Sequence, residues 1–112
     1  MPTTPAPPLL DVRTFSDDDA LTIVLQGEAD VANHDLLRMS LDGVELRGTR
    51  TVMLDLSRLV FCDLYGFREL IAFAARARRW GVETLVTGAR PVVRKMAQIL
   101  GTAGDVPFEP PG

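Results

Sequence analysis

The segment Val60-Phe61-Cys62-Asp63-Leu64-Tyr65-Gly66-Phe67 is the most informative part of this 112-residue chain. It follows an apolar run at residues 52–56, which predicts a strand. After it, apolar residues recur at three- and four-residue spacing and predict an amphipathic helix over 64–79. A strand is therefore expected to lead into a helix that begins at Asp63. The first turn of a helix presents unpaired N–H groups and the positive end of the dipole, so it can be capped by Asp, bind an anion or dock a partner.

The composition indicates one globular domain with one core. Apolar residues make up 46% of the chain, which favours a packed domain over disorder. The net charge of -3 argues against nucleic acid as the main partner. No apolar run is long enough to span a membrane, and the N-terminus lacks the features of a secretory signal. A cytoplasmic protein is expected.

Periodicity and turn residues predict the element order β-β-α-β-α-β-α. Strands are expected at 9–15, 21–25, 51–56 and 82–87, and helices from Asn33 to about Leu46, over 64–79 and from Pro91 to Gly101. Because strand-helix-strand units require parallel crossovers, the expected fold class is α/β, with a mixed, mostly parallel sheet and helices packed on it.

Turn residues and apolar periodicity also predict where the elements end and which helix faces are buried. Gly27-Glu28-Ala29-Asp30 is expected to break the second strand, and Gly48 to end the first helix. Residues 106–108 fit either a short final strand or a packed tail. The inward helix faces are expected to contain Leu36, Leu37, Ser40, Leu41 and Val44, and then Val92, Val93, Met96, Ile99 and Leu100. Residues 1–8 are proline-rich and expected to be flexible, and residues 109–112 are expected to fray.

The strand, the Asp-x-x-Gly turn and the helix after it resemble the phosphorylation turn of the STAS domain, the family of anti-sigma-factor antagonists. Gly27-Glu28-Ala29-Asp30 is similar to the Gly-Glu-Leu-Asp motif that ends the second strand of that family. Asp63 and Gly66 match the turn, whereas Leu64 stands where the family carries its phosphorylatable serine. The resemblance covers about residues 9–108 and implies a STAS-like fold.

The resemblance also implies what the substitution at Leu64 changes. In the family, a kinase that is also the anti-sigma factor phosphorylates the serine, and the added charge weakens its binding. Leucine cannot accept phosphate, so the resemblance implies binding without this switch. Leu64 fits two interpretations, a first-turn residue tucked partly into the core or an apolar contact at the centre of a partner surface. Tyr65 is a poor phosphoacceptor but a credible contact residue.

The resemblance also implies that two carboxylates, Asp30 and Asp63, lie near this helix start. Asp63 fits an ordinary N-cap or a carboxylate with a role beside a phosphoacceptor, and Asp30 with Asn33 fits a turn. No nucleophile and base complete an active site, so no enzyme is expected. The only histidine, His34, is expected at the surface, and the only cysteine, Cys62, in the core. No metal site and no cofactor are expected.

Basic residues cluster in two helices. These are Arg76, Arg78 and Arg79 in the second helix, and Arg90, Arg94 and Lys95 in the third. Both groups are expected to form solvated faces, with a docking patch for an acidic partner as the alternative.

The preferred hypothesis is a non-enzymatic bacterial signalling domain that acts in transcription regulation. It would bind an anti-sigma factor or a related serine-kinase-like ATPase through protein–protein contacts. The expected partner-binding residues are Asp30, Asn33, Phe61, Asp63, Leu64, Tyr65, Gly66 and Arg68. The alternatives are a cytoplasmic STAS subunit of a membrane transport complex and a sensor of small anions or nucleotides. The sequence is also compatible with a homodimer.

Overall fold

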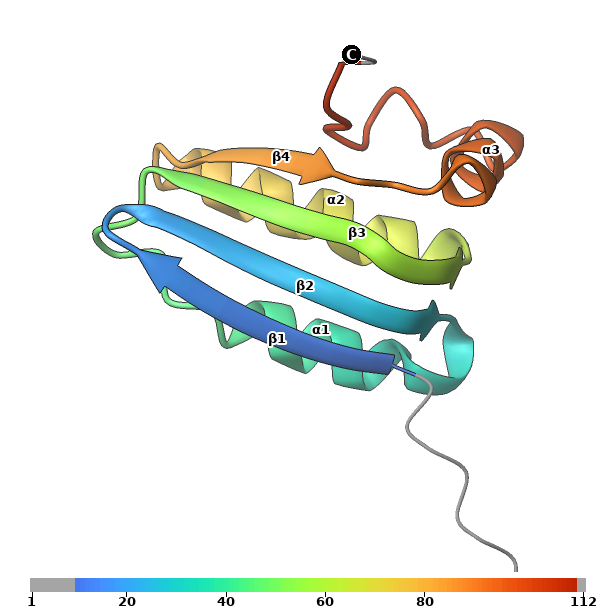
Figure 1. Ribbon diagram of the computed structural model, residues 1–112, viewed down its shortest axis with the longest axis horizontal. Helices are drawn as coiled ribbons and strands as arrows, with labels where there is room; N and C mark the ends of the chain where they lie inside the picture. The colour runs from blue at the N-terminus through green and yellow to red at the C-terminus, as the bar shows by residue number, and fades with distance from the viewer. Residues whose placement is uncertain (1–9, 111–112) are drawn as a thin grey trace, which may run out of the picture.

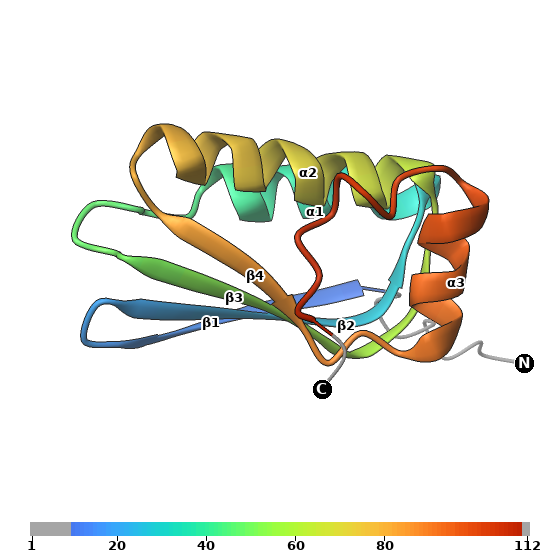
Figure 2. The same cartoon turned by 90° about the horizontal axis from the view of Figure 1, so that it is seen from above.

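The computed structural model describes residues 10–110, so the predictions for residues 1–8 and 111–112 lie outside it. The strands are β1 Leu10–Asp17, β2 Ala20–Ala29, β3 Thr51–Cys62 and β4 Glu83–Thr87. The helices are the short 3-10 helix η1 Val31–Asn33, then α1 His34–Asp42, α2 Leu64–Arg79 and α3 Pro91–Ile99. The strands form one sheet in the order β1-β2-β3-β4, with α1 and α2 on one face and α3 at one end (Figures 1 and 2).

The sheet is mixed, as predicted. β1 and β2 form an antiparallel hairpin, whereas β2 pairs parallel with β3 and β3 pairs parallel with β4. The α/β class and the element order β-β-α-β-α-β-α are confirmed. Because β2 and β3 run in the same direction, their carboxyl ends meet at one edge, where Ala29 pairs with Cys62. The chain leaves this edge into η1 and into α2, so the sheet brings the Asp30 loop and the Asp63 turn together.

The core lies between the sheet and the two helices that cover it. Every second residue of β3 from Val52 to Leu56 is buried, and Cys62 is buried as predicted. The largest fully buried side chains include Leu10, Ile23, Leu25, Leu37, Leu41, Leu54, Leu56, Leu59, Phe67 and Leu70. The start of α2 is anchored in this core by Phe67, which fixes the position of the turn before it.

Two boundaries differ from the sequence predictions. β2 does not break at Gly27 but continues to Ala29, with shifts in its register against β3 between Val24 and Gln26 and between Gly27 and Glu28. Such irregularities let a strand continue past a glycine that has a positive φ, here 104°. The first helix ends at Asp42, with Gly43 as its C-cap, well before Gly48.

Some residues assigned to the inward helix faces are exposed instead. Leu37 and Leu41 define the buried face of α1, and Val93 and Ala97 define that of α3. The predicted members that point to solvent are Leu36, Val92, Ile99 and Leu100. Each lies next to or beyond the true stripe, because both helices are short and their ends carry apolar residues outside the core.

The segment after α3 returns to the sheet and pairs with the free edge of β4. Phe108 forms a parallel bridge with Val86. The Val86 N–H donates to the Pro107 carbonyl at 2.7 Å, and the Val86 carbonyl accepts from the Glu109 N–H at 2.8 Å. A short strand contact is therefore present at Phe108. Glu109, which the sequence places in the frayed tail, is hydrogen-bonded at this edge.

Candidate partner-binding site

Asp63 caps the N-terminus of α2. Its Oδ1 accepts a hydrogen bond from the Gly66 N–H at 2.9 Å, and its carbonyl accepts one from the Phe67 N–H at 3.0 Å. Its own N–H donates to the Ala29 carbonyl at 2.9 Å, which ties the turn to the end of β2. A side-chain cap of this kind stabilises a helix by about 1 kcal/mol. The geometry therefore shows the N-cap role of Asp63.

Gly66 lets the first turn of α2 lie directly against the sheet. A Cβ atom at this position would lie 2.7 Å from Cys62 Sγ and 3.0 Å from Ala29 Cβ. Real Cβ atoms do not approach heavy atoms this closely, so the turn requires glycine. Gly66 is buried and offers a partner no side chain. Its contribution to the site is the close packing that places its neighbours.

The Asp30 loop is held by a reciprocal pair of caps. Asp30 Oδ1 accepts from the Ala32 N–H at 2.9 Å, and the Asp30 N–H donates to Asn33 Oδ1 at 3.0 Å. Asn33 Nδ2 donates to the Glu28 carbonyl at 2.7 Å. These bonds satisfy the orphan donors at the start of a helix and fix the loop. Asp30 and Asn33 thus shape the loop beside the Asp63 turn.

The side chains that reach solvent here are mostly apolar. Tyr65 is 48% exposed and Phe61 36%, Arg68 is also exposed, and Leu64 is half-buried. Val31 of η1, which the sequence analysis missed, is 67% exposed. No local sequence pattern predicts this exposure. We call Val31, Phe61, Leu64 and Tyr65 the turn surface.

His34 lies at the first residue of α1 with its side chain partly exposed, but it also makes two side-chain contacts that the sequence did not predict. Its Nε2 lies 2.8 Å from Glu69 Oε1, and both side chains are mostly shielded from solvent. The imidazole also packs edge-on against the Tyr65 ring, with 5.7 Å between the ring centroids. His34 opens α1, whereas Tyr65 and Glu69 belong to α2, so this contact fixes both helix starts and orients Tyr65. No local sequence signal predicts a contact between positions 35 residues apart.

The Cys62 thiol lies beneath the turn. Burial, and to a lesser extent the negative charge of Asp63, raise the pKa of this thiol far above its ordinary value. The thiol therefore stays neutral at physiological pH, and a neutral thiol is a poor nucleophile and metal ligand. Within residues 10–110 no group of three or more His, Cys, Asp or Glu side chains is arranged to hold a metal ion.

Several of the arginines expected to be solvated donate hydrogen bonds to backbone carbonyls of the same chain. Arg76 Nη2 donates to the Leu41 carbonyl at 2.7 Å, close to the C-terminus of α1. Arg90 Nε at 3.0 Å and Arg94 Nη2 at 3.2 Å donate to backbone carbonyls outside α3. Arg78 remains exposed. The prediction of two solvated basic faces is therefore wrong for Arg76 and Arg94, which are partly buried, whereas Arg90 is exposed as predicted.

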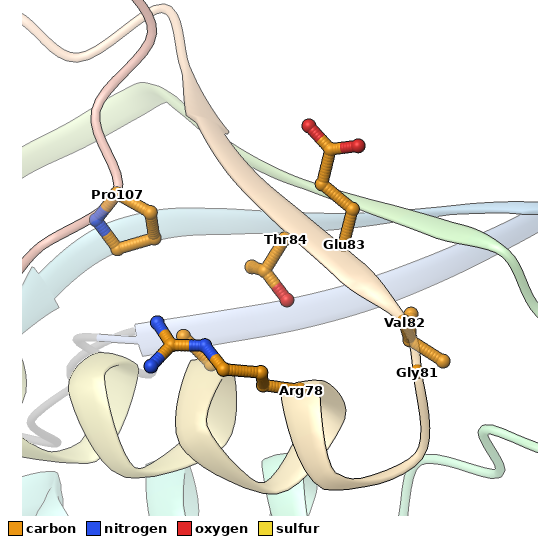
Figure 3. A pocket seen from close by; sticks show the side chains of 7 residues that line it. Arg78, Gly81, Val82, Glu83, Thr84 and Pro107 are labelled. Carbon is orange, nitrogen blue, oxygen red and sulfur yellow. The ribbon is translucent and has the colours of Figure 1, made fainter.

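A pocket of about 350 Å³ lies beside the C-terminal half of α2. Figure 3 shows the Arg78 side chain extending along the pocket below Thr84, while Glu83 points away from the helix. Thr84 Oγ1 is buried and has no hydrogen-bond partner within the described residues. This pocket is at the opposite end of α2 from Leu64, so it does not provide the anion site that the sensor alternative places at the helix start.

None of the helices within residues 10–110 combines the length and the apolar character that crossing a membrane requires.

Comparison with known proteins identifies the family. Residues 12–107 match the family described as "Mlab, STAS domain", so the chain belongs to the STAS domain family. It is 32% identical over 84 residues to BtrV of Bordetella bronchiseptica, which is assigned as an anti-sigma factor antagonist. That alignment spans 75% of this chain and 72% of the relative.

Solved structures show the same fold. An anti-sigma factor antagonist from Mycobacterium paratuberculosis superposes with a TM-score of 0.74 at 20% identity, over 95% of this chain and 90% of that one. The anti-sigma factor antagonist SpoIIAA in its unphosphorylated form superposes with a TM-score of 0.68 at 19% identity, over 90% of this chain and 88% of that one. The predicted STAS-like architecture is confirmed.

Proposed function

We propose that this protein is an interaction domain of the anti-sigma-factor-antagonist type, which binds an anti-sigma factor or a serine-kinase-like ATPase through the turn surface. One observation carries the proposal. The Asp63 cap and the close packing of Gly66 against the sheet hold the start of α2 beside the Asp30 loop. Apolar side chains project into solvent from this region. Membership of the STAS family and the relationship to BtrV support this partner class.

The turn surface has the character of a protein contact rather than an anion site. Tyr65 and Phe61 supply large, partly exposed rings, and aromatic residues are enriched where binding energy concentrates. The Gly66 N–H is already occupied by the Asp63 carboxylate. That carboxylate also places negative charge where an incoming anion would sit. These features favour a protein partner over a small-anion or nucleotide ligand.

Phosphate at residue 64 does not gate this binding in the proposed mechanism. Leu64 carries no oxygen, and the nearby Tyr65 ring is packed against His34. Phosphorylation of a serine would add nearly two negative charges to this surface and would weaken an apolar contact. With Leu64 in place, the domain binds its partner constitutively.

An affinity pull-down from the native cell tests the surface. We expect the wild-type protein to retain one specific partner that Leu64→Glu loses, because the new charge would be desolvated at the contact. Trp80→Glu is the matched control, since Trp80 is an exposed apolar residue at the far end of the same helix. Equal recovery by wild type and Leu64→Glu would remove the turn surface from the binding site. Recovery of a membrane transport ATPase would instead support the transport-complex alternative.

A second experiment tests whether any residue of the turn is phosphorylated. The protein is mixed with the recovered kinase-like partner and ATP and then weighed by intact mass spectrometry. No change in mass is expected. A stoichiometric gain of about 80 Da, the mass of one phosphate group, on a residue of the turn would refute constitutive binding. A Leu64→Ser variant serves as the positive control for kinase activity.

A further inference from the structure

The two edges of the sheet are unequal. The edge of β4 is partly covered by the bridge between Val86 and Phe108. The edge of β1 has no partner strand within residues 10–110. All residues of β1 from Arg13 to Asp17 are exposed. A free strand edge presents unpaired N–H and C=O groups, which readily pair with another chain.

We propose that two copies of this protein pair through their β1 strands, antiparallel and about a two-fold axis at Phe15. The sheet of one copy would then continue into the sheet of the other. A two-fold interface uses the same patch on both copies, so the patch must be complementary to itself. The side chains of β1 meet this condition in the register centred on Phe15.

In that register, the opposite residues between Arg13 and Asp17 include ion pairs and an aromatic pair, while Asp11 faces Asp19, which lies in the hairpin turn beyond the strand. Successive side chains of a strand point to opposite faces, and Thr14 and Ser16 face α1, so Arg13, Phe15 and Asp17 lie on the face away from the helices. Pairing centred on Phe15 places Arg13 of each copy opposite Asp17 of the other and Phe15 opposite Phe15. Thr14 then lies opposite Ser16 on the other face. Opposite charges and aromatic pairs across neighbouring strands are both stabilising.

The other registers are less favourable. Centring the axis on Arg13 sets two guanidinium groups opposite each other, and centring it on Thr14 sets Asp11 opposite Asp17. Centring on Val12 pairs Asp11 with Arg13 but leaves Phe15, which is 57% exposed, outside the ladder. Within one copy, Arg13 Nε already lies 2.8 Å from Asp11 Oδ2, but this pair is exposed and such pairs contribute little. Arg13 is therefore free to exchange partners on association.

A groove next to the edge would be covered by the second copy. A hollow of about 450 Å³ lies between β1 and the second half of α1. Thr14 and Ser16 line it from the strand and Met39 lines it from the helix. The Met39 side chain is 68% exposed. Pairing of the β1 strands would bring the same helix of the second copy alongside and shield Met39 from water.

The dimer would leave the turn surface open. The tight turn between β1 and β2 lies at one end of the molecule, whereas η1 and α3 lie at the other (Figure 2). The inference is therefore independent of the proposed function, and each can fail without the other. A dimer would present two turn surfaces and could engage a dimeric partner at both sites.

Exchange of the two charges at Arg13 and Asp17 tests the pairing. Sedimentation velocity over a range of concentrations measures the dimer in each variant. The wild type is expected to dimerise, and Arg13→Glu or Asp17→Lys alone is expected to weaken the dimer by about tenfold or more, because each sets like charges opposite each other. The double variant restores opposite charges and is expected to dimerise like wild type. Lys95→Glu, an exposed charge reversal on α3, is the control that should not change association.

A cross-link fixes the register. Residues directly opposite in an antiparallel pair have Cα atoms about 4.5–5.5 Å apart, which a disulfide can bridge. Phe15→Cys is therefore expected to form a covalent dimer on mild oxidation, whereas Val92→Cys, exposed on α3, should not. A wild type that stays monomeric up to about 1 mM would overturn the proposal. So would a charge exchange that fails to restore the dimer, or a Phe15→Cys variant that does not cross-link.

Discussion

His34 Nε2 lies 2.8 Å from Glu69 Oε1, and this contact joins the start of α1 to α2. Both side chains are largely shielded, so removal of either leaves the other without its partner. We expect His34→Ala and Glu69→Ala each to lower the free energy of unfolding by about 1–2 kcal/mol. Urea unfolding measures both, and a double-mutant cycle should give a coupling of about 0.5–1.5 kcal/mol. Strictly additive effects would show that the two side chains do not interact.

Arg76 closes the opposite end of the same helix pair. Its Nη2 donates to the Leu41 carbonyl at 2.7 Å, and its guanidinium lies 5.5 Å from the centre of the Phe73 ring. We expect Arg76→Ala to destabilise the protein by about 1–2 kcal/mol. Arg78→Ala, two residues along the helix and exposed, should change stability by less than about 0.5 kcal/mol. Thermal and urea unfolding compare the two, and equal effects would contradict a special role for Arg76.

The limits of α2 could be predicted because local signals set them. Asp63 caps its first turn, and at its end the Val82 N–H bonds to the Ala77 carbonyl while Gly81 takes a φ of 73°. This is the Schellman arrangement that glycine favours. The continuation of β2 past Gly27 could not be predicted, because it depends on pairing with β3, far away in the chain.

Gly66→Ala tests the close packing at the turn. Alanine favours a helix by about 1 kcal/mol over glycine, but its Cβ would lie 2.7 Å from Cys62 Sγ. We expect the clash to dominate, with a net loss of about 1–3 kcal/mol in urea unfolding. Gly104→Ala, where an added Cβ meets nothing within 4 Å, should not destabilise the protein. A second change, Cys62→Ala, should recover part of the loss in Gly66→Ala, and no recovery would place the strain elsewhere.

The candidate site was only partly predictable, because some of its features are set by local sequence and others by packing between distant segments. The caps at Asp30 and Asp63 follow from side-chain types at fixed short spacings, whereas the expectation that both loops lie near one helix start came from the resemblance to the STAS family. The exposure of Val31 depends on how η1 turns away from the sheet, and the contact of His34 with Tyr65 depends on the packing of two helices. Neither has a local pattern, and both decide which side chains a partner meets.

Because of Cys62, the free energy of unfolding should fall at alkaline pH. Burial, followed by the charge of Asp63, raises the pKa of the thiol in the folded state, whereas in the unfolded chain it ionises near pH 8.5, roughly. The folded state holds this proton more tightly, so the stabilisation is complete below the unfolded pKa and declines as the pH rises above it. Between about pH 7.5 and pH 9.5 we expect a loss of about 1.4 kcal/mol in the free energy of unfolding. Cys62→Ala is the control for other groups that titrate in this range. Its free energy of unfolding should fall by about 1.4 kcal/mol less than that of the wild type between the two pH values. Identical pH dependence in the two proteins, measured by urea unfolding, would show that the thiol does not contribute.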